Sequence, residues 1–195
     1  MISVVIPTHE SERLLAHTLA ALVPGALDGV LREVIVADAG SKDGTAKVAD
    51  VAGCRFMVIP GARGARLAAA AATARADWLW FVQPGTVPGT NWIEELGGFI
   101  RECELTGDCN HAAVFRARGG RGASPLAEAL ALIAAAMGAK PKPSQGLLIP
   151  KALYQSMGGY KAGATDPEAD LLRRLGRKRI ATLDVAIRQI LDSVN

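Results

Sequence analysis

Four short apolar runs, each followed by a segment with helical periodicity, constrain the fold of this 195-residue chain most strongly. Runs that stay apolar on successive residues are typical of strands buried on both faces. Strands that alternate with helices predict right-handed crossovers and a mostly parallel sheet sandwiched by helices, so the expected class is α/β and Rossmann-like. The four runs cover residues 2–6, 34–37, 56–59 and 78–82.

The second half of the chain is expected to add further strands and helices to the same sheet. A helix from Ser11 is expected to end before Pro24, because proline lacks the N–H that a helix interior needs. The other expected helices begin near residues 45, 65, 90, 126, 150 and 166, and the other expected strands cover 112–117 and 146–149. From Ile180 we expect a strand that runs into a terminal helix.

Length and composition favour one domain over residues 1–195. Apolar residues make up 50% of the chain and charged residues 21%, which is enough for a sizeable core. The net charge of +3 is too weak and too dispersed to indicate nucleic acid as a partner. Basic clusters at 173–174 and 177–179 indicate either a solvated surface or a contact with phosphate or a membrane surface.

Cysteine usage and hydropathy bear on the compartment. Cys54, Cys103 and Cys109 form an odd set without CxxC spacing, which argues against a disulfide framework or a zinc site. No run is long enough to span a bilayer, and the N-terminus lacks a basic segment with a cleavage site. We therefore expect a cytoplasmic protein.

The segment Asp38–Thr45 follows the second apolar run directly and has the composition of a ligand-binding loop. In open α/β sheets, ligands bind just beyond the carboxyl ends of the strands, where this segment is expected. Asp38 is able to accept hydrogen bonds from a base or ribose, and Gly40 and Gly44 allow the backbone to approach a ligand closely. Asp43 has an alternative role as a cap for the helix that starts at Thr45.

Two motifs together resemble the nucleotide-binding half of family 2 glycosyltransferases with the GT-A fold. The first is Ile6-Pro7-Thr8-His9-Glu10, and the second is Asp38-Ala39-Gly40-Ser41-Lys42-Asp43-Gly44-Thr45. The resemblance continues through Gly64-Ala65-Arg66 and Asp77–Phe81, and more loosely through 145–151 and 157–160, which resemble the family's acceptor half. It implies a nucleotide-binding half at 1–105 and an acceptor-side half at 106–195 within the one domain. It implies that a nucleotide-sugar binds at Pro7, Thr8, Glu10, Asp38, Ser41 and Asp43, with Arg66 facing the pyrophosphate.

The chain departs from that family at the residues that hold a divalent metal. The family carries an Asp-x-Asp triplet after the fourth strand, and its last carboxylate binds the Mg²⁺ or Mn²⁺ that bridges the diphosphate. Here the corresponding residues are Gln83-Pro84-Gly85, so no metal-binding residue is assigned. If the loop keeps the family's geometry, Gly85→Asp is expected to restore Mn²⁺-dependent nucleotide binding.

The resemblance also implies a catalytic base at the start of the helix at 166–175. Glu168 falls on the base position and Asp170 lies close to it, although both are also typical first-turn acids of a helix. The expected function is a hexosyltransferase-type, inverting glycosyltransferase that acts on an unknown acceptor. The alternative is a non-catalytic protein that binds a nucleotide or nucleotide-sugar. An NAD-type Rossmann protein is excluded, because Pro7-Thr8-His9-Glu10-Ser11 replaces its glycine-rich turn.

Overall fold

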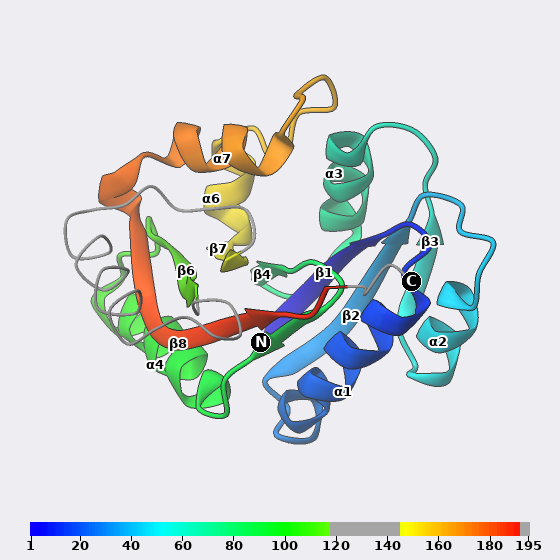
Figure 1. Ribbon diagram of the computed structural model, residues 1–195. Helices are drawn as coiled ribbons and strands as arrows, with labels where there is room; N and C mark the ends of the chain where they lie inside the picture. Colours follow the sequence, from blue (N-terminus) through cyan, green and yellow to red (C-terminus); the bar gives the residue numbers. More distant parts are fainter. Residues whose placement is uncertain (118–144, 192–195) are drawn as a thin grey trace, which may run out of the picture.

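The computed structural model describes residues 1–117 and 145–191, which form one eight-stranded sheet between two layers of helices (Figure 1). The strand order is β3-β2-β1-β4-β7-β6-β8-β5. The first four strands in this order are parallel to one another, and β7 runs antiparallel to β4. The predicted α/β fold with a mostly parallel sheet is confirmed.

The strands and helices of the described residues agree with most of the predicted elements. The strands are β1 (Ile2–Thr8), β2 (Leu31–Asp38), β3 (Arg55–Val58), β4 (Trp78–Phe81), β5 (Thr86–Pro88), β6 (Ala112–Ala117), β7 (Leu147–Pro150) and β8 (Ile180–Gln189). The helices are α1 (Glu12–Leu27), α2 (Thr45–Val51), α3 (Arg63–Thr73), α4 (Trp92–Thr106), α6 (Lys151–Ser156), α7 (Pro167–Leu175) and the 3₁₀ turn η2 (Arg177–Arg179). The helix expected from residue 126 lies outside the described residues.

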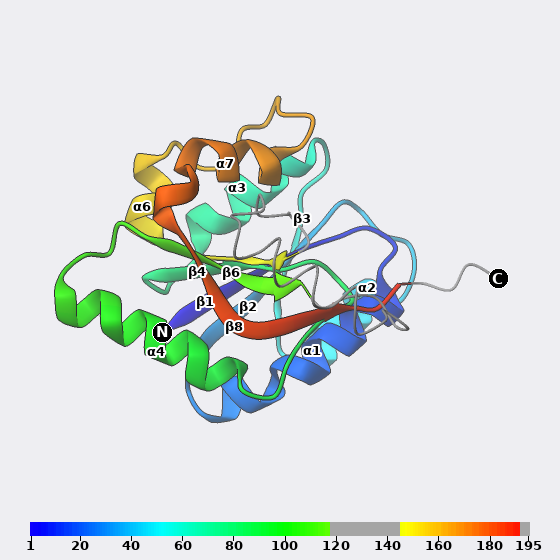
Figure 2. The ribbon, with the colours of Figure 1, turned by 60° about the vertical axis from the view of Figure 1, so that its left-hand side comes forward.

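The central strands are apolar throughout because both of their faces are buried. Val4 and Trp80 point into a core formed with α1 and α4, whereas Val5 and Leu79 point into a core formed with α3, α6 and α7. Figure 2 shows these two helical layers on opposite sides of the sheet. Because successive side chains of a strand point to opposite faces, each short run contributes to both cores.

The prediction that the first helix ends before Pro24 is wrong, because α1 continues to Leu27. Pro24 cannot donate a hydrogen bond, but its carbonyl accepts one from Asp28 N at 2.9 Å, so the last turn closes. The next residue, Gly25, packs directly against the indole ring of Trp92. Packing against α4 thus outweighs the local cost of the proline.

The strand expected from Ile180 is confirmed, but the terminal helix expected to follow it is wrong for the described residues, because β8 extends to Gln189. Leu183, Val185 and Ile187 are buried on alternate positions, which is the two-residue period of a half-buried strand. β8 pairs parallel with β6 and antiparallel with the three-residue strand β5. That short strand was not predicted from the sequence.

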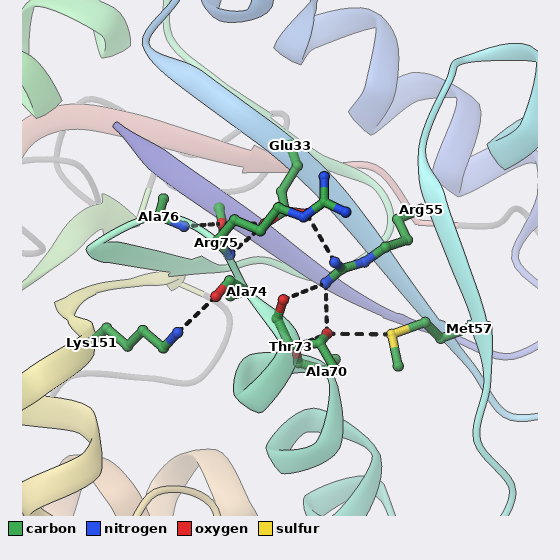
Figure 3. A network of polar contacts seen from close by, with 10 residues as sticks. Glu33, Arg55, Met57, Ala70, Thr73, Ala74, Arg75, Ala76 and Lys151 are labelled. Atoms are coloured by element: carbon green, nitrogen blue, oxygen red, sulfur yellow. Dashed lines mark hydrogen bonds and ion pairs between the residues drawn. The ribbon is translucent and has the colours of Figure 1, made fainter.

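A network of polar contacts fixes the carboxyl end of α3 to the sheet (Figure 3). Arg55 Nη2 donates to Thr73 O at 2.9 Å, and Lys151 Nζ donates to Ala74 O at 2.7 Å. Glu33 accepts from Arg75 N at 2.6 Å and forms an ion pair with Arg55 at 3.3 Å. These contacts satisfy carbonyls that a helix end leaves without partners, and they set the position of α3.

Two helical glycines give a matched test of the contact between α1 and α4. A Cβ on Gly25 would lie 2.2 Å from the Trp92 ring, whereas a Cβ on Gly98 of α4 meets nothing within 4 Å. Gly25→Ala is expected to lower the free energy of unfolding by about 1–3 kcal/mol through overpacking. Gly98→Ala is expected to raise it by up to about 1 kcal/mol through helix propensity. Urea denaturation measures both, and shifts of the same sign would contradict this packing.

Candidate functional site

The loops that follow β1 and β2 meet at the carboxylate of Asp38, which is only 1% exposed. Its Oδ1 accepts from Thr8 Oγ1 at 2.8 Å and from Ser41 Oγ at 2.6 Å. Its Oδ2 accepts from the backbone N–H of Gly40 at 2.7 Å and of Ser41 at 2.6 Å. Gly40 has a φ of +103°, which allows the chain to fold back around the carboxylate.

The pKa of Asp38 reflects two opposing effects of this geometry. Burial by itself raises the pKa, but the hydrogen bonds from Ser41, Thr8 and Gly40 favour the charged form and outweigh it. The net effect lowers the pKa below the ordinary value of an aspartate. Asp38 is therefore a buried anion whose charge organises the loop.

Reciprocal hydrogen bonds join the β1 loop to the β2 loop. Glu10 N donates to Ser41 Oγ at 2.8 Å, and Lys42 N donates to Glu10 Oε1 at 2.8 Å. Glu12 N donates to Asp43 Oδ2 at 3.0 Å. Glu10 has a φ of +47°, a conformation that non-glycine residues seldom adopt and that these contacts hold in place.

Asp43 also stabilises the start of α2, as the alternative interpretation of the sequence proposed. Its Oδ1 accepts from Thr45 N at 3.0 Å and from Thr45 Oγ1 at 2.5 Å. These bonds and the one from Glu12 N outweigh the effect of desolvation and lower the pKa of Asp43. Its carboxylate is therefore used for the loop itself, in addition to any contact with a ligand.

A small cavity lies where β1 and β4 end, beside the start of α3 and of α7. Its volume is about 20 Å³, which is room for one water molecule. Eleven residues line it: Pro7, Arg63, Leu67, Phe81, Val82, Gln83, Gly146, Leu147, Tyr160, Glu168 and Leu172. Among these, Arg63 Nε donates to Glu168 Oε1 at 2.7 Å, so the predicted base is held in an ion pair.

Close packing of α3 against the segment before α7 brings Arg63 to Glu168. A Cβ on Gly64 would lie 2.2 Å from the carbonyl oxygen of Lys161, so only glycine allows this approach. Asp166 caps α7 by accepting from Ala169 N at 2.8 Å, which places Glu168 in the first turn. The two predicted halves of the chain thus meet at this pair.

The structure brings most of the predicted site residues together, but it places Asp170 elsewhere. Pro7 and Glu168 line the cavity, while Thr8, Glu10, Asp38, Ser41 and Asp43 form the adjoining loops. Asp170 is paired with Arg173 at 2.5 Å and with Arg174 at 2.8 Å on its own helix. The bond from Arg174 is the largest of the effects that lower the pKa of Asp170.

Arg66 lies near the start of α3 and is 7% exposed. Its Nη1 donates to Gly61 O at 3.0 Å, and its buried Nε has no hydrogen-bond partner among the described residues. Burial and the neighbouring charge of Arg63 lower the pKa of Arg66, whereas the charge of Asp38 raises it. Among the described residues, no carboxylate is hydrogen-bonded to this buried cation.

The position expected for a metal-binding carboxylate does not fit a metal here. Gly85 has a φ of +84°, and a Cβ on it would lie 2.4 Å from the carbonyl oxygen of Ile190. Gly85 also donates to Leu14 O at 3.0 Å and accepts from Ile190 N at 2.8 Å, so the backbone after β8 occupies this corner. Within residues 1–117 and 145–191, no group of three His, Cys, Asp or Glu side chains is placed to hold a metal ion.

Residues 3–121 match the family model described as "Glycosyl transferase family 2". The chain belongs to this family. The structure is similar to that of glucosyl-3-phosphoglycerate synthase from Mycobacterium tuberculosis in complex with Mn²⁺, UDP and glucosyl-3-phosphoglycerate, with a TM-score of 0.70 and 25% identity over 98% of this chain and 72% of that one. The complex of the same enzyme with Mn²⁺, UDP-glucose and phosphoglyceric acid gives a TM-score of 0.71 and 25% identity over 100% and 73%. No match was found among curated proteins.

Family membership and these neighbours confirm the resemblance to GT-A glycosyltransferases that the two motifs indicated. The roles of individual site residues stay predictions. Tyr160 and Leu172 also line the cavity. Tyr160 lies in the stretch 157–160 that loosely resembles the family, but neither residue was predicted to belong to the site. Among the described residues, no helix has the length and apolar character needed to cross a membrane.

The Asp38 network predicts a pH-dependent contribution to stability. Because folding lowers this pKa, the contribution is present above the unfolded value near pH 4 and is lost as the pH falls through the folded value. Asp38→Asn is expected to cost about 1–3 kcal/mol at pH 7, and the difference from the parent is expected to shrink below about pH 4. Urea denaturation between pH 3 and 8 measures this, with exposed Asp50→Asn as the control. A difference that does not change with pH would contradict it.

The closed corner at Gly85 predicts that a side chain is not tolerated there, contrary to the expectation that Gly85→Asp restores metal binding. Gly85→Ala combines a left-handed backbone with a clash against Ile190, whereas Gly53→Ala has a φ of +68° and meets nothing within 4 Å. Gly53→Ala is expected to cost about 1–2 kcal/mol from conformation alone, and Gly85→Ala about 1–3 kcal/mol more. Equal losses in urea denaturation would show that Ile190 does not close this corner.

Proposed function

We propose that this chain transfers a hexosyl group from a nucleotide-sugar to an acceptor with inversion at the anomeric carbon. Membership of glycosyl transferase family 2 supports glycosyl transfer in general. The observation that carries the finer proposal is the cavity at the ends of β1 and β4, where Glu168 and Arg63 face the edge of the predicted nucleotide loops. UDP-glucose and phosphoglyceric acid, both present in a matched structure, are the first donor and acceptor to test.

The donor's base and ribose are proposed to bind at the loops after β1 and β2. Because Asp38 already accepts four hydrogen bonds, a ligand is expected to exchange with the Ser41 hydroxyl, which also accepts from Glu10 N. The bound nucleotide would thus replace bonds that now join the two loops. The proposed nucleotide-binding residues are Pro7, Thr8, Glu10, Asp38, Ser41, Asp43 and Arg66.

Glu168 is proposed to act as the general base. Its carboxylate takes the proton of the acceptor hydroxyl as that oxygen attacks the anomeric carbon, and the nucleoside diphosphate leaves with the electron pair of the broken C–O bond. Arg63 holds Glu168 at 2.7 Å, so this ion pair has to open or shift when the acceptor binds. Asp170, the second predicted acid, is paired with Arg173 and Arg174 of its own helix, and we therefore assign the proton transfer to Glu168.

A non-catalytic nucleotide-binding protein is the second candidate, and two observations favour it. The cavity holds only about one water molecule, and the proposed base is already paired with Arg63. Such a protein would bind a nucleotide without turnover of any donor. The two candidates therefore differ in whether bound donor is consumed.

Location and surface contacts belong to the same proposal. All three cysteines are free thiols, which supports the expected cytoplasmic location. Arg177, Lys178 and Arg179 are exposed in η2, and they are the proposed contact if the acceptor lies at a membrane surface.

Glu168→Gln tests the enzyme proposal directly. The amide keeps the size of the side chain but cannot accept a proton, so release of UDP from UDP-glucose with phosphoglyceric acid is expected to fall by at least about 100-fold. Binding of UDP, measured by calorimetry, is expected to be retained and to be at least as tight as in the parent, because Arg63 is no longer held by a charged partner. Glu102→Gln on the exposed face of α4 is the control and is expected to keep full activity. Full activity of Glu168→Gln would remove the assigned base, and UDP binding by the parent without turnover would support the non-catalytic candidate.

A further inference from the structure

We propose that this chain binds the diphosphate of its donor with the guanidinium group of Arg66 and without a divalent metal, because Ile190 closes the metal corner. The inference rests on the proposed function, since it concerns the same donor site. It differs from the two matched complexes described above, which contain Mn²⁺ together with UDP or UDP-glucose, whereas another matched structure of the same enzyme is a complex with UDP.

The closure of the metal corner depends on β8 and on the residues that follow it. Gln189 Nε2 donates to Pro84 O at 2.6 Å, and Thr86 Oγ1 donates to Gln189 Oε1 at 3.0 Å. Ile190 N then donates to Gly85 O at 2.8 Å. The loop that would carry a metal ligand is therefore paired along its length with the end of the chain's last strand, and its side chains offer amide and hydroxyl groups in place of carboxylates.

Arg66 supplies a positive charge in α3, where it interacts with the charges of Asp38 and Arg63. Ile59 N donates to Asp38 O at 2.8 Å, which fixes the end of β3 beside the Asp38 loop, and Arg66 Nη1 holds Gly61 O in the next turn. Arg66 is only 7% exposed. In the described part of the chain it nevertheless makes one side-chain hydrogen bond, and its buried Nε has no partner. A buried cation with unused donors is costly unless an anion completes its contacts.

The start of α3 adds to the preference for an anion. Its first turn contains no acidic residue. Its N-cap, Ala62, has no side-chain atom that can accept hydrogen bonds from the backbone N–H groups of that turn. The N-terminus of a helix favours phosphate through these N–H groups and through the helix dipole. Guanidinium also binds phosphate through two parallel N–H bonds, which suits Arg66 to a diphosphate.

Arg63 is the second cation at this helix start, but it serves a different group. Its Nε is bound to Glu168, and its charge acts on Arg66 as a repulsion that a bound anion would relieve. A diphosphate between the two guanidinium groups would therefore be attracted by both. It would also draw Arg63 away from Glu168, and this release would free the Glu168 carboxylate to act as the proposed base.

The experiment measures binding of uridine and of UDP by calorimetry, with EDTA and with Mn²⁺. The parent is expected to bind UDP equally well, within about twofold, in both conditions. Arg66→Ala is expected to weaken UDP binding by at least about tenfold, because charge-assisted hydrogen bonds to the diphosphate are lost. Its affinity for uridine is expected to stay unchanged. Arg66→Lys keeps the charge without the planar guanidinium group, and its UDP affinity is expected to lie between those of the parent and of Arg66→Ala. Arg32→Ala, an exposed arginine of β2, is the matched control.

The outcomes separate this inference from the function on which it rests. Uridine binding together with UDP binding that requires Mn²⁺ would overturn the inference and leave the donor site in place. UDP binding by Arg66→Ala at the parent's affinity would also overturn it. Failure of the parent to bind either ligand would remove the donor site and both proposals. The melting temperature of Arg66→Ala verifies folding, and if that variant unfolds, Arg66→Lys with the EDTA comparison still decides.

Discussion

The buried carboxylate of Asp38 is the interaction on which the candidate site depends. It collects donors from the end of β1 and from its own turn, so two loops that are neighbours only through the sheet become one unit. A carboxylate in this setting is stable as an anion because its hydrogen bonds outweigh desolvation. The backbone carbonyl of the same residue accepts from Ile59 N, which joins the segment between β3 and α3 to the end of β2.

The elements of the sheet were largely predictable because each central strand is buried on both faces and so reads as a continuous apolar run. Local sequence failed where distant contacts decided the outcome. Pro24 was expected to end α1, but the packing of Gly25 on Trp92 carries the helix past it. A strand from Ile180 was expected to run into a helix, yet the alternating Leu183, Val185 and Ile187 continue it as a strand between β6 and β5.

The candidate site was likewise predictable where its contacts are local in sequence and unpredictable where they join distant residues. The loops around Asp38 were predictable because strand, turn and helix follow each other within a few residues, and the two motifs together identified the family. The pairing of Arg63 with Glu168 joins positions 105 residues apart and depends on Gly64, whose missing side chain carries no signal in one sequence. The replacement of Asp by Gly85 was visible, but its partner Ile190 was not, since only the three-dimensional structure brings the last strand to that loop.

The placement of β8 between β6 and β5 also determines what the sheet offers to other molecules. At one edge lies β5, which is three residues long and includes Pro88, a residue without an N–H to donate. At the other edge lies β3, with four residues. Short edge strands are poor templates for strand addition, and the proline of β5 weakens that edge further, so the arrangement disfavours edge-to-edge aggregation. Deletion of β8 would remove the strand that pairs with β6 and expose this edge of β6. We would therefore expect the protein to aggregate through that edge.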